Sequence, residues 1–140
     1  LCGRRRALER GAMTAATWEE LTKDLKPDAV EKLRAARAFC LSIGETRESI
    51  TRTQIRFYLT RTYCEAFIIS GRLELTVDLL HSVKHPRLIA VFPTTSQVIT
   101  HRFSLPELAD FDDQIKAWIV EGYETVGPGF RKTKKTNLIR

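Results

Sequence analysis

Two histidines four residues apart have the spacing of a metal site in this chain of 140 residues. On a helix, His81 and His85 would share one face, and two imidazoles placed in this way can bind one metal ion. However, Pro86 disfavours helical geometry at the residue before it, and the glutamate of a metalloprotease helix is absent. We therefore interpret both as surface histidines and expect no metal site.

Three neighbouring aspartates, Asp110, Asp112 and Asp113, could offer the oxygen ligands that Mg²⁺ and Ca²⁺ prefer. The glycine and the final glutamate of an EF-hand loop are missing. A helix N-terminus explains all three carboxylates because it is partly positive. The seven glycines form no GxGxxG or GxxxxGK motif, so no nucleotide-phosphate loop is predicted. We expect no cofactor.

A small hydrolase with a pocket around His101 and Cys64 is the enzymatic alternative, because a cysteine nucleophile needs a nearby base. His101 shares a predicted strand face with Ile99 and Phe103, where a histidine is usually a hydrogen-bonded core or edge residue. Exposure of His101 in a pocket would favour catalysis, whereas burial among apolar side chains would remove it. Since the sequence has no catalytic motif, we favour a non-enzymatic function.

The alternative to catalysis is a binding surface on the solvent face of a sheet. Guanidinium groups beside an aromatic ring suit contact with phosphates and stacking on bases. Acidic residues on the same strands favour a different explanation, in which cross-strand ion pairs keep an exposed sheet soluble. The order of the strands would decide between the two. The candidate ligand-binding residues are Arg52, Arg56, Tyr58, Arg72 and Arg102, and the acidic residues are Glu65, Glu74 and Asp78.

The net charge of +6 belongs to the two ends of the chain. Residues 1–12 carry four arginines and one glutamate, and residues 131–140 carry five lysines or arginines, whereas residues 13–130 have 14 basic and 16 acidic side chains. We therefore expect a tag or disordered arm over 1–12, a single domain over 13–130 and a basic disordered tail over 131–140. A pI near 9.5 is then weak evidence for nucleic-acid binding by the folded part.

Helix signals lie at both ends of the predicted domain. Thr17 and Glu20 have the spacing of a capping box, and Pro27 is suited to the first position of a second helix that ends at Gly44. Ser104 with Glu107 predicts the start of a final helix, whose apolar face precedes a Gly-Pro-Gly stop. That face is formed by Phe111, Ile115, Trp118, Ile119 and Tyr123.

Between these helices the hydrophobic period changes from 3.6 to 2, which is typical of strands. Four strands are predicted, and they begin near residues 55, 63, 72 and 97. Residues 87–91 are expected to form a helical turn and residues 93–96 a loop. The predicted fold is α+β, with two N-terminal helices, a four-stranded and largely antiparallel sheet, and a C-terminal helix packed on one face.

Several short segments resemble an uncharacterised bacterial family of domains of unknown function. The resemblance covers about residues 45–126, and none of its segments is a catalytic signature. It implies a small α+β domain without an assigned activity, found alone or beside predicted nuclease and transport-like domains. The segments are residues 50–53 (ITRT), 73–75 (LEL), 85–87 (HPR) and 112–119 (DDQIKAWI), together with Phe57, Glu65 and Tyr123.

These observations predict a cytoplasmic binding or accessory domain. No stretch is long and apolar enough for a membrane helix, and the N-terminus lacks the apolar run of a secretory signal. The expected partner is a nucleic acid or another protein, bound through the sheet face, and pairing of sheet edges in a homodimer is a further hypothesis.

Overall fold

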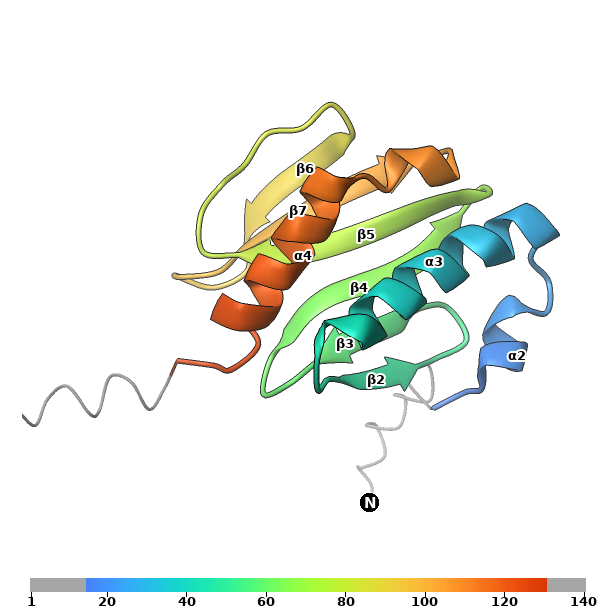
Figure 1. Ribbon diagram of the computed structural model, residues 1–140, viewed down its shortest axis with the longest axis horizontal. Helices are drawn as coiled ribbons and strands as arrows, with labels where there is room; N and C mark the ends of the chain where they lie inside the picture. The colour runs from blue at the N-terminus through green and yellow to red at the C-terminus, as the bar shows by residue number, and fades with distance from the viewer. Residues whose placement is uncertain (1–14, 131–140) are drawn as a thin grey trace, which may run out of the picture.

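A six-stranded antiparallel sheet organises the protein, and its helices lie on one side of it (Figure 1). The computed structural model describes residues 15–130, so the predicted arm over 1–12 and the basic tail over 131–140 lie outside it. The strand order is β2-β3-β4-β5-β7-β6. The elements are α2 (Trp18–Thr22), α3 (Pro27–Ile43), β2 (Arg47–Ile50), β3 (Ile55–Tyr58), β4 (Thr62–Ile69), β5 (Arg72–Leu79), β6 (Leu88–Pro93), β7 (Ile99–Leu105), the 3₁₀ turn η2 (Leu108–Asp110) and α4 (Asp113–Thr125).

The N-terminal helices begin where the capping signals predict. The Thr17 hydroxyl accepts a hydrogen bond from the Glu20 backbone at 3.0 Å, and the Glu20 carboxylate accepts one from the Thr17 backbone at 2.9 Å. Pro27 is the first residue of α3, which ends before Gly44. The predicted start of the last helix at Ser104 is wrong, because Ser104 lies in β7 and the N-cap of α4 is Asp112.

The prediction of four strands is also wrong, because β2 and β6 were missed. Strand β2 has the sequence RESI, in which polar and apolar residues do not alternate. Strand β6 lies where a helical turn and a loop were expected. It is an edge strand with a register shift between Leu88 and Ala90, and it ends at Pro93, which an edge strand tolerates. The described fold is nevertheless α+β, with the sheet antiparallel throughout.

The core lies between the sheet and two helices. Both α3 and α4 contact the central strands β4 and β5, and Figure 1 shows them side by side across the same face. The strand residues that point toward them are fully buried, among them Ile55, Phe57, Leu75 and Phe103. Because side chains alternate along a strand, every second residue points to the opposite face, which no helix of the described chain covers.

Candidate functional site

The face of the sheet opposite α3 and α4, here called the open face, gathers most of the charged residues of the central strands. Its middle row follows the strand register, from Arg56 on β3 through Glu65 on β4 and Thr76 on β5 to Arg102 on β7. Arginines outnumber carboxylates on this face and at its rim. The arginines are Arg56, Arg61, Arg72 and Arg102, and the carboxylates are Glu65, Glu74 and Asp78.

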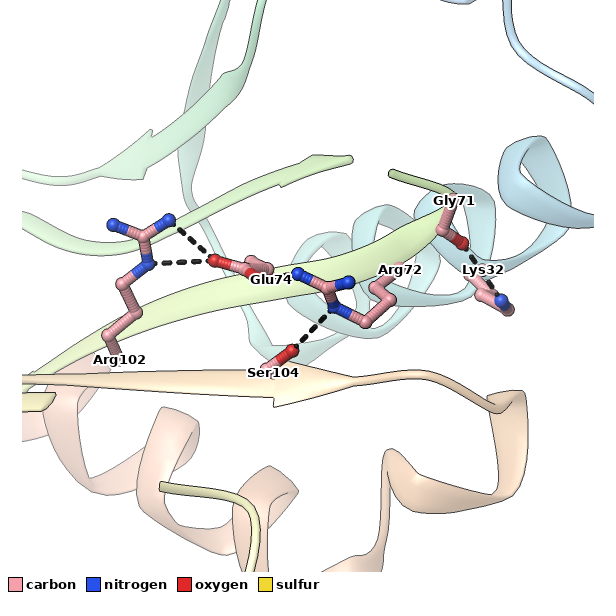
Figure 2. Close-up of polar contacts among 6 residues, drawn as sticks. All are labelled: Lys32, Gly71, Arg72, Glu74, Arg102 and Ser104. Atoms are coloured by element: carbon pink, nitrogen blue, oxygen red, sulfur yellow. Dashed lines mark hydrogen bonds and ion pairs between the residues drawn. The ribbon is translucent and has the colours of Figure 1, made fainter. Parts of the chain in front are cut away.

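Glu74 connects two of the predicted site residues in the centre of the open face (Figure 2). Its carboxylate accepts hydrogen bonds from Arg102 Nε at 2.8 Å and Nη2 at 2.5 Å, and Arg72 Nη2 lies 3.3 Å away. Arg72 Nε also donates to the Ser104 hydroxyl at 3.0 Å. The Glu74 side chain is only 3% exposed, whereas the two arginine side chains are 40% and 35% exposed. The cross-strand ion pairs considered from the sequence therefore exist here, and both guanidinium groups still reach solvent.

Arg56 has a different environment from these paired arginines. Its guanidinium carbon lies 5.5 Å from the centre of the Tyr58 ring, on the same strand. Its Nε–H is buried and has no hydrogen-bond partner among the described residues, and the same holds for Nε of Arg61 in the turn between β3 and β4. Since buried donors are normally paired, both guanidinium groups would gain a hydrogen bond by turning toward an incoming acceptor.

A hollow of about 430 Å³ lies at one end of the open face, between the β3–β4 turn and the β6–β7 hairpin. Four of its eight lining residues are threonines, and the others are two carboxylates, one arginine and one aromatic ring. Such a volume is in the range of small-ligand pockets. The lining residues are Arg61, Thr62, Glu65, Thr76, Asp78, Phe92, Thr94 and Thr100.

The turn that holds Arg61 is fixed by the end of the chain that follows α4. The backbone N–H groups of Thr60 and Arg61 both donate to the carbonyl of Gly127, each at 2.9 Å. The guanidinium carbon of Arg61 lies 5.6 Å from the centre of the Phe130 ring. The rim of the hollow therefore depends on residues that are nearly 70 positions apart in the sequence.

Both carboxylates of the hollow bind protons more tightly than usual. Burial raises the pKa of Asp78 to about 6; the Thr100 hydroxyl opposes this shift, Glu65 adds to it and Arg61 opposes it. Burial also raises the pKa of Glu65, against the effects of Arg56 and of the Thr76 hydroxyl. Raised carboxylate pKa values in a concave site are typical of functional groups.

A model of the family described as Domain of unknown function (DUF5655) matches residues 18–126. The chain belongs to this family. The match confirms the resemblance noted from the sequence and extends it over α2 and α3. No curated protein and no solved structure matches the DUF5655 chain. The neighbouring nuclease and transport-like domains, and the bacterial origin, stay predictions.

The DUF5655 domain does not bring His101 and Cys64 together. Both are buried on the helix-covered face, and Val77 of β5 lies between them in the register, so the two residues are about 10 Å apart. His101 Nδ1 lies 3.3 Å from the Val77 carbonyl, and Nε2 accepts from the Val83 N–H at 3.1 Å. Burial lowers the pKa of His101, which favours the neutral ring. The hydrolase hypothesis thus loses the exposed histidine that it required.

The other two histidines bind separate carboxylates. His81 Nε2 lies 2.6 Å from Glu121 in the C-terminal half of α4, and His85 Nε2 lies 3.0 Å from Asp112 at the N-terminus of α4. His81 is exposed as predicted, whereas the prediction of a surface position is wrong for His85, whose side chain is only 9% exposed and packs against Phe103 and Trp118. Over residues 15–130, no three His, Cys, Asp or Glu side chains form a group that could hold a metal ion. Asp112 caps α4 by accepting from the Ile115 N–H at 2.9 Å, as the helix-terminus interpretation predicts.

Arg52 is the one predicted site residue that lies apart from the others. It follows β2 in the turn before β3, and its guanidinium group lies 3.7 Å from Glu20 on α2. Sequence reasoning in turn missed Arg61, Phe92 and the hollow itself. Glu65 and Asp78 were noted only as charge partners, because their common position becomes visible only with the strand order. None of the helices among residues 15–130 is long and apolar enough to cross a membrane.

Replacing Asp78 with asparagine tests whether the ionised Asp78 carboxylate lowers the free energy of unfolding. Because the folded pKa lies above the unfolded value of 3.8, the folded state binds the proton more tightly, and stability falls as the pH rises from about 4 to about 6. Asp78→Asn should therefore raise the free energy of unfolding by about 1–2 kcal/mol at pH 8, and by less than about 0.5 kcal/mol at pH 4. Urea denaturation at both pH values measures this, and an equal gain at both would contradict titration as the cause.

Proposed function

We propose that the DUF5655 domain binds single-stranded nucleic acid through the open face of its sheet. The observation that carries this proposal is the pair of buried, unpartnered Nε–H groups of Arg56 and Arg61, one beside Tyr58 and the other at the hollow. A phosphate oxygen is the acceptor that such guanidinium groups bind best. The proposed contacts are Arg56, Tyr58, Arg61, Arg72 and Arg102; Arg52 is left out because it lies apart from them, in the turn between β2 and β3.

The aromatic groups favour a single strand over a duplex. Tyr58, Phe67 and Phe92 lie on three strands of the open face, and Arg102 lies 5.1 Å from the centre of the Phe67 ring. Aromatic rings and guanidinium planes stack on bases that are not already stacked in a duplex. Arginines near these rings can then contact the phosphates between successive bases.

Fluorescence anisotropy of labelled single- and double-stranded DNA and RNA, titrated with the full chain over a salt series, tests this proposal. We expect a single strand to bind more tightly than a duplex, and Arg56→Ala and Tyr58→Ala each to weaken binding by about tenfold. Arg56→Ala should also make the salt dependence less steep, since one phosphate contact is lost.

Two controls separate the open face from other positive charge. Arg34→Ala removes an exposed arginine from α3, on the helix-covered side, and should change the affinity less than about twofold. Lys134→Ala with Lys135→Ala removes charge from the C-terminal segment. If these substitutions weaken binding as much as Arg56→Ala, or if no nucleic acid binds, the proposal is wrong and a protein partner becomes the leading hypothesis.

Self-association through a sheet edge stays a prediction. Edge strand β6 exposes Ile89, Val91 and Phe92 and carries no charged side chain, whereas edge strand β2 contains Arg47 and Glu48. Charged edge strands resist pairing with a second sheet. If the chain forms a dimer, β6 is therefore the edge at which we expect it.

A further inference from the structure

The hollow at the end of the open face has more specific chemistry than phosphate binding requires. Its lining combines two carboxylate acceptors with an aromatic ring and an arginine. Asp78 Oδ1 accepts from the Thr100 hydroxyl at 2.8 Å, while Oδ2 has no hydrogen-bond partner within residues 15–130. Glu65 supplies a second carboxylate. A ligand with adjacent N–H donors would satisfy these acceptors.

We propose that this hollow binds a guanine base, an inference that rests on the nucleic-acid function proposed above and adds base selectivity to it. Ionised carboxylates only accept hydrogen bonds. Guanine alone among the four RNA bases presents two adjacent donors, N1–H and the N2 amine, on its pairing edge. Adenine and cytosine place a ring nitrogen acceptor beside their amine, and uracil places its single N–H between two carbonyls, so each would leave a carboxylate facing an acceptor.

The rest of the lining fits the remainder of a guanine nucleotide. Phe92 is 46% exposed and offers a ring face for stacking. The Nε–H of Arg61 is buried and unpartnered, so the Arg61 guanidinium group, which lines the hollow, would gain a hydrogen bond by turning toward the phosphate attached to the base. The threonine hydroxyls can each donate or accept, so they are compatible with the carbonyl oxygen of guanine. The volume of about 430 Å³ admits one nucleotide.

Selectivity for guanine should depend on pH through Asp78. The charged groups that face Asp78 are Glu65 of β4 and Arg61 of the β3–β4 turn; β6 and β7 present the Phe92 ring and the hydroxyl of Thr100. When Asp78 is protonated, it offers a donor to the donor edge of guanine. The preference for guanine should therefore decline from pH 8 to pH 5, whereas phosphate contacts by the arginines should not, because arginine stays charged.

The test uses the full chain and labelled uridine oligomers of about eight nucleotides in which one central base is uracil, guanine, hypoxanthine or adenine. We expect the guanine oligomer to bind about tenfold more tightly than the other three at pH 8. Hypoxanthine is the sharpest comparison, because it lacks only the N2 amine. Asp78→Asn should abolish the preference and leave the affinity for the uracil oligomer unchanged within about twofold.

Control variants keep the outcome decisive. Glu124→Gln removes an exposed carboxylate from α4, away from the hollow, and should retain the full preference. Circular dichroism checks that the Asp78→Asn variant is folded. Glu65→Gln removes the charge of the second carboxylate and tests the same preference independently. Equal binding of all four oligomers, or a preference that survives both substitutions, overturns the guanine pocket but not the binding face. Absence of binding by every oligomer overturns both.

Discussion

Gly122→Ala should lower the free energy of unfolding by about 2–3 kcal/mol, although alanine is the better helix former. Gly122 is buried in α4, where a Cβ atom would lie 2.7 Å from the backbone carbonyl oxygen of Asp78. The next contacts, with Tyr63, would be 3.6 Å away. Because the obstructing atom belongs to the backbone of β5, no side-chain rotation can relieve the overlap, and the helix must move away from the sheet. Urea denaturation of the full chain measures the loss.

The matched substitution is Glu124→Ala, two residues further along α4 and exposed, which should change stability by less than about 0.5 kcal/mol. If Gly122→Ala were instead more stable than the wild type by about 1 kcal/mol, as helix propensity alone predicts, the close approach of α4 to β5 would be wrong. The result also bears on function, since the contact lies directly behind Asp78, which lines the hollow.

Glu74→Gln should weaken the fold and strengthen nucleic-acid binding at the same time. The Glu74 carboxylate is almost fully buried and pairs with Arg72 and Arg102. Losing its charge should cost about 2 kcal/mol, less than for a fully buried pair, because both arginines are more than a third exposed and water can solvate them. The guanidinium groups of Arg72 and Arg102 are then free to bind phosphates, and the net charge of the open face becomes more positive by one unit.

We expect Glu74→Gln to bind a single-stranded oligonucleotide about threefold to tenfold more tightly at low salt, with a steeper salt dependence. Anisotropy titrations and urea denaturation on the same preparation measure the two effects. Glu31→Gln is the control: it removes a charge from α3, where Glu31 pairs with exposed Arg34, and should change neither quantity appreciably. Unchanged affinity in a folded Glu74→Gln variant would exclude Arg72 and Arg102 from the binding face.

The sequence predicts best those elements whose boundaries are set by local interactions. The capping box of Thr17 and Glu20, Pro27 at the first position of α3 and the alternation along β5 each depend on residues close in the chain. Strand β6 could not be predicted in this way. Its residues Leu88–Pro93 are apolar throughout, so the sequence shows no alternation of polar and apolar residues there, and only its pairing with β7 defines it.

Only part of the candidate site could be predicted from the sequence, because the rest depends on the order of the strands. Arg56, Tyr58, Arg72 and Arg102 could be assigned to a solvent face from alternation alone. Their partners could not, since whether Arg102 reaches Glu74 depends on β7 inserting between β5 and β6. The hollow could not be predicted without the position of β7 between β5 and β6, because residues of β4, β5, β6 and β7 line it together with Arg61 of the β3–β4 turn.

The hydrogen bonds from the β3–β4 turn to Gly127 have a consequence for the rest of the chain. They anchor the polypeptide beside Arg61, so whatever follows Phe130 is covalently tethered at the entrance to the hollow. The next residues are rich in lysine and arginine. A tethered group acts at a local concentration far above that of free protein, in the millimolar range for short linkers. For a strand bound as proposed, we therefore expect the positive charge that follows Phe130 to add a weakly selective attraction, smaller than the contribution of Arg56.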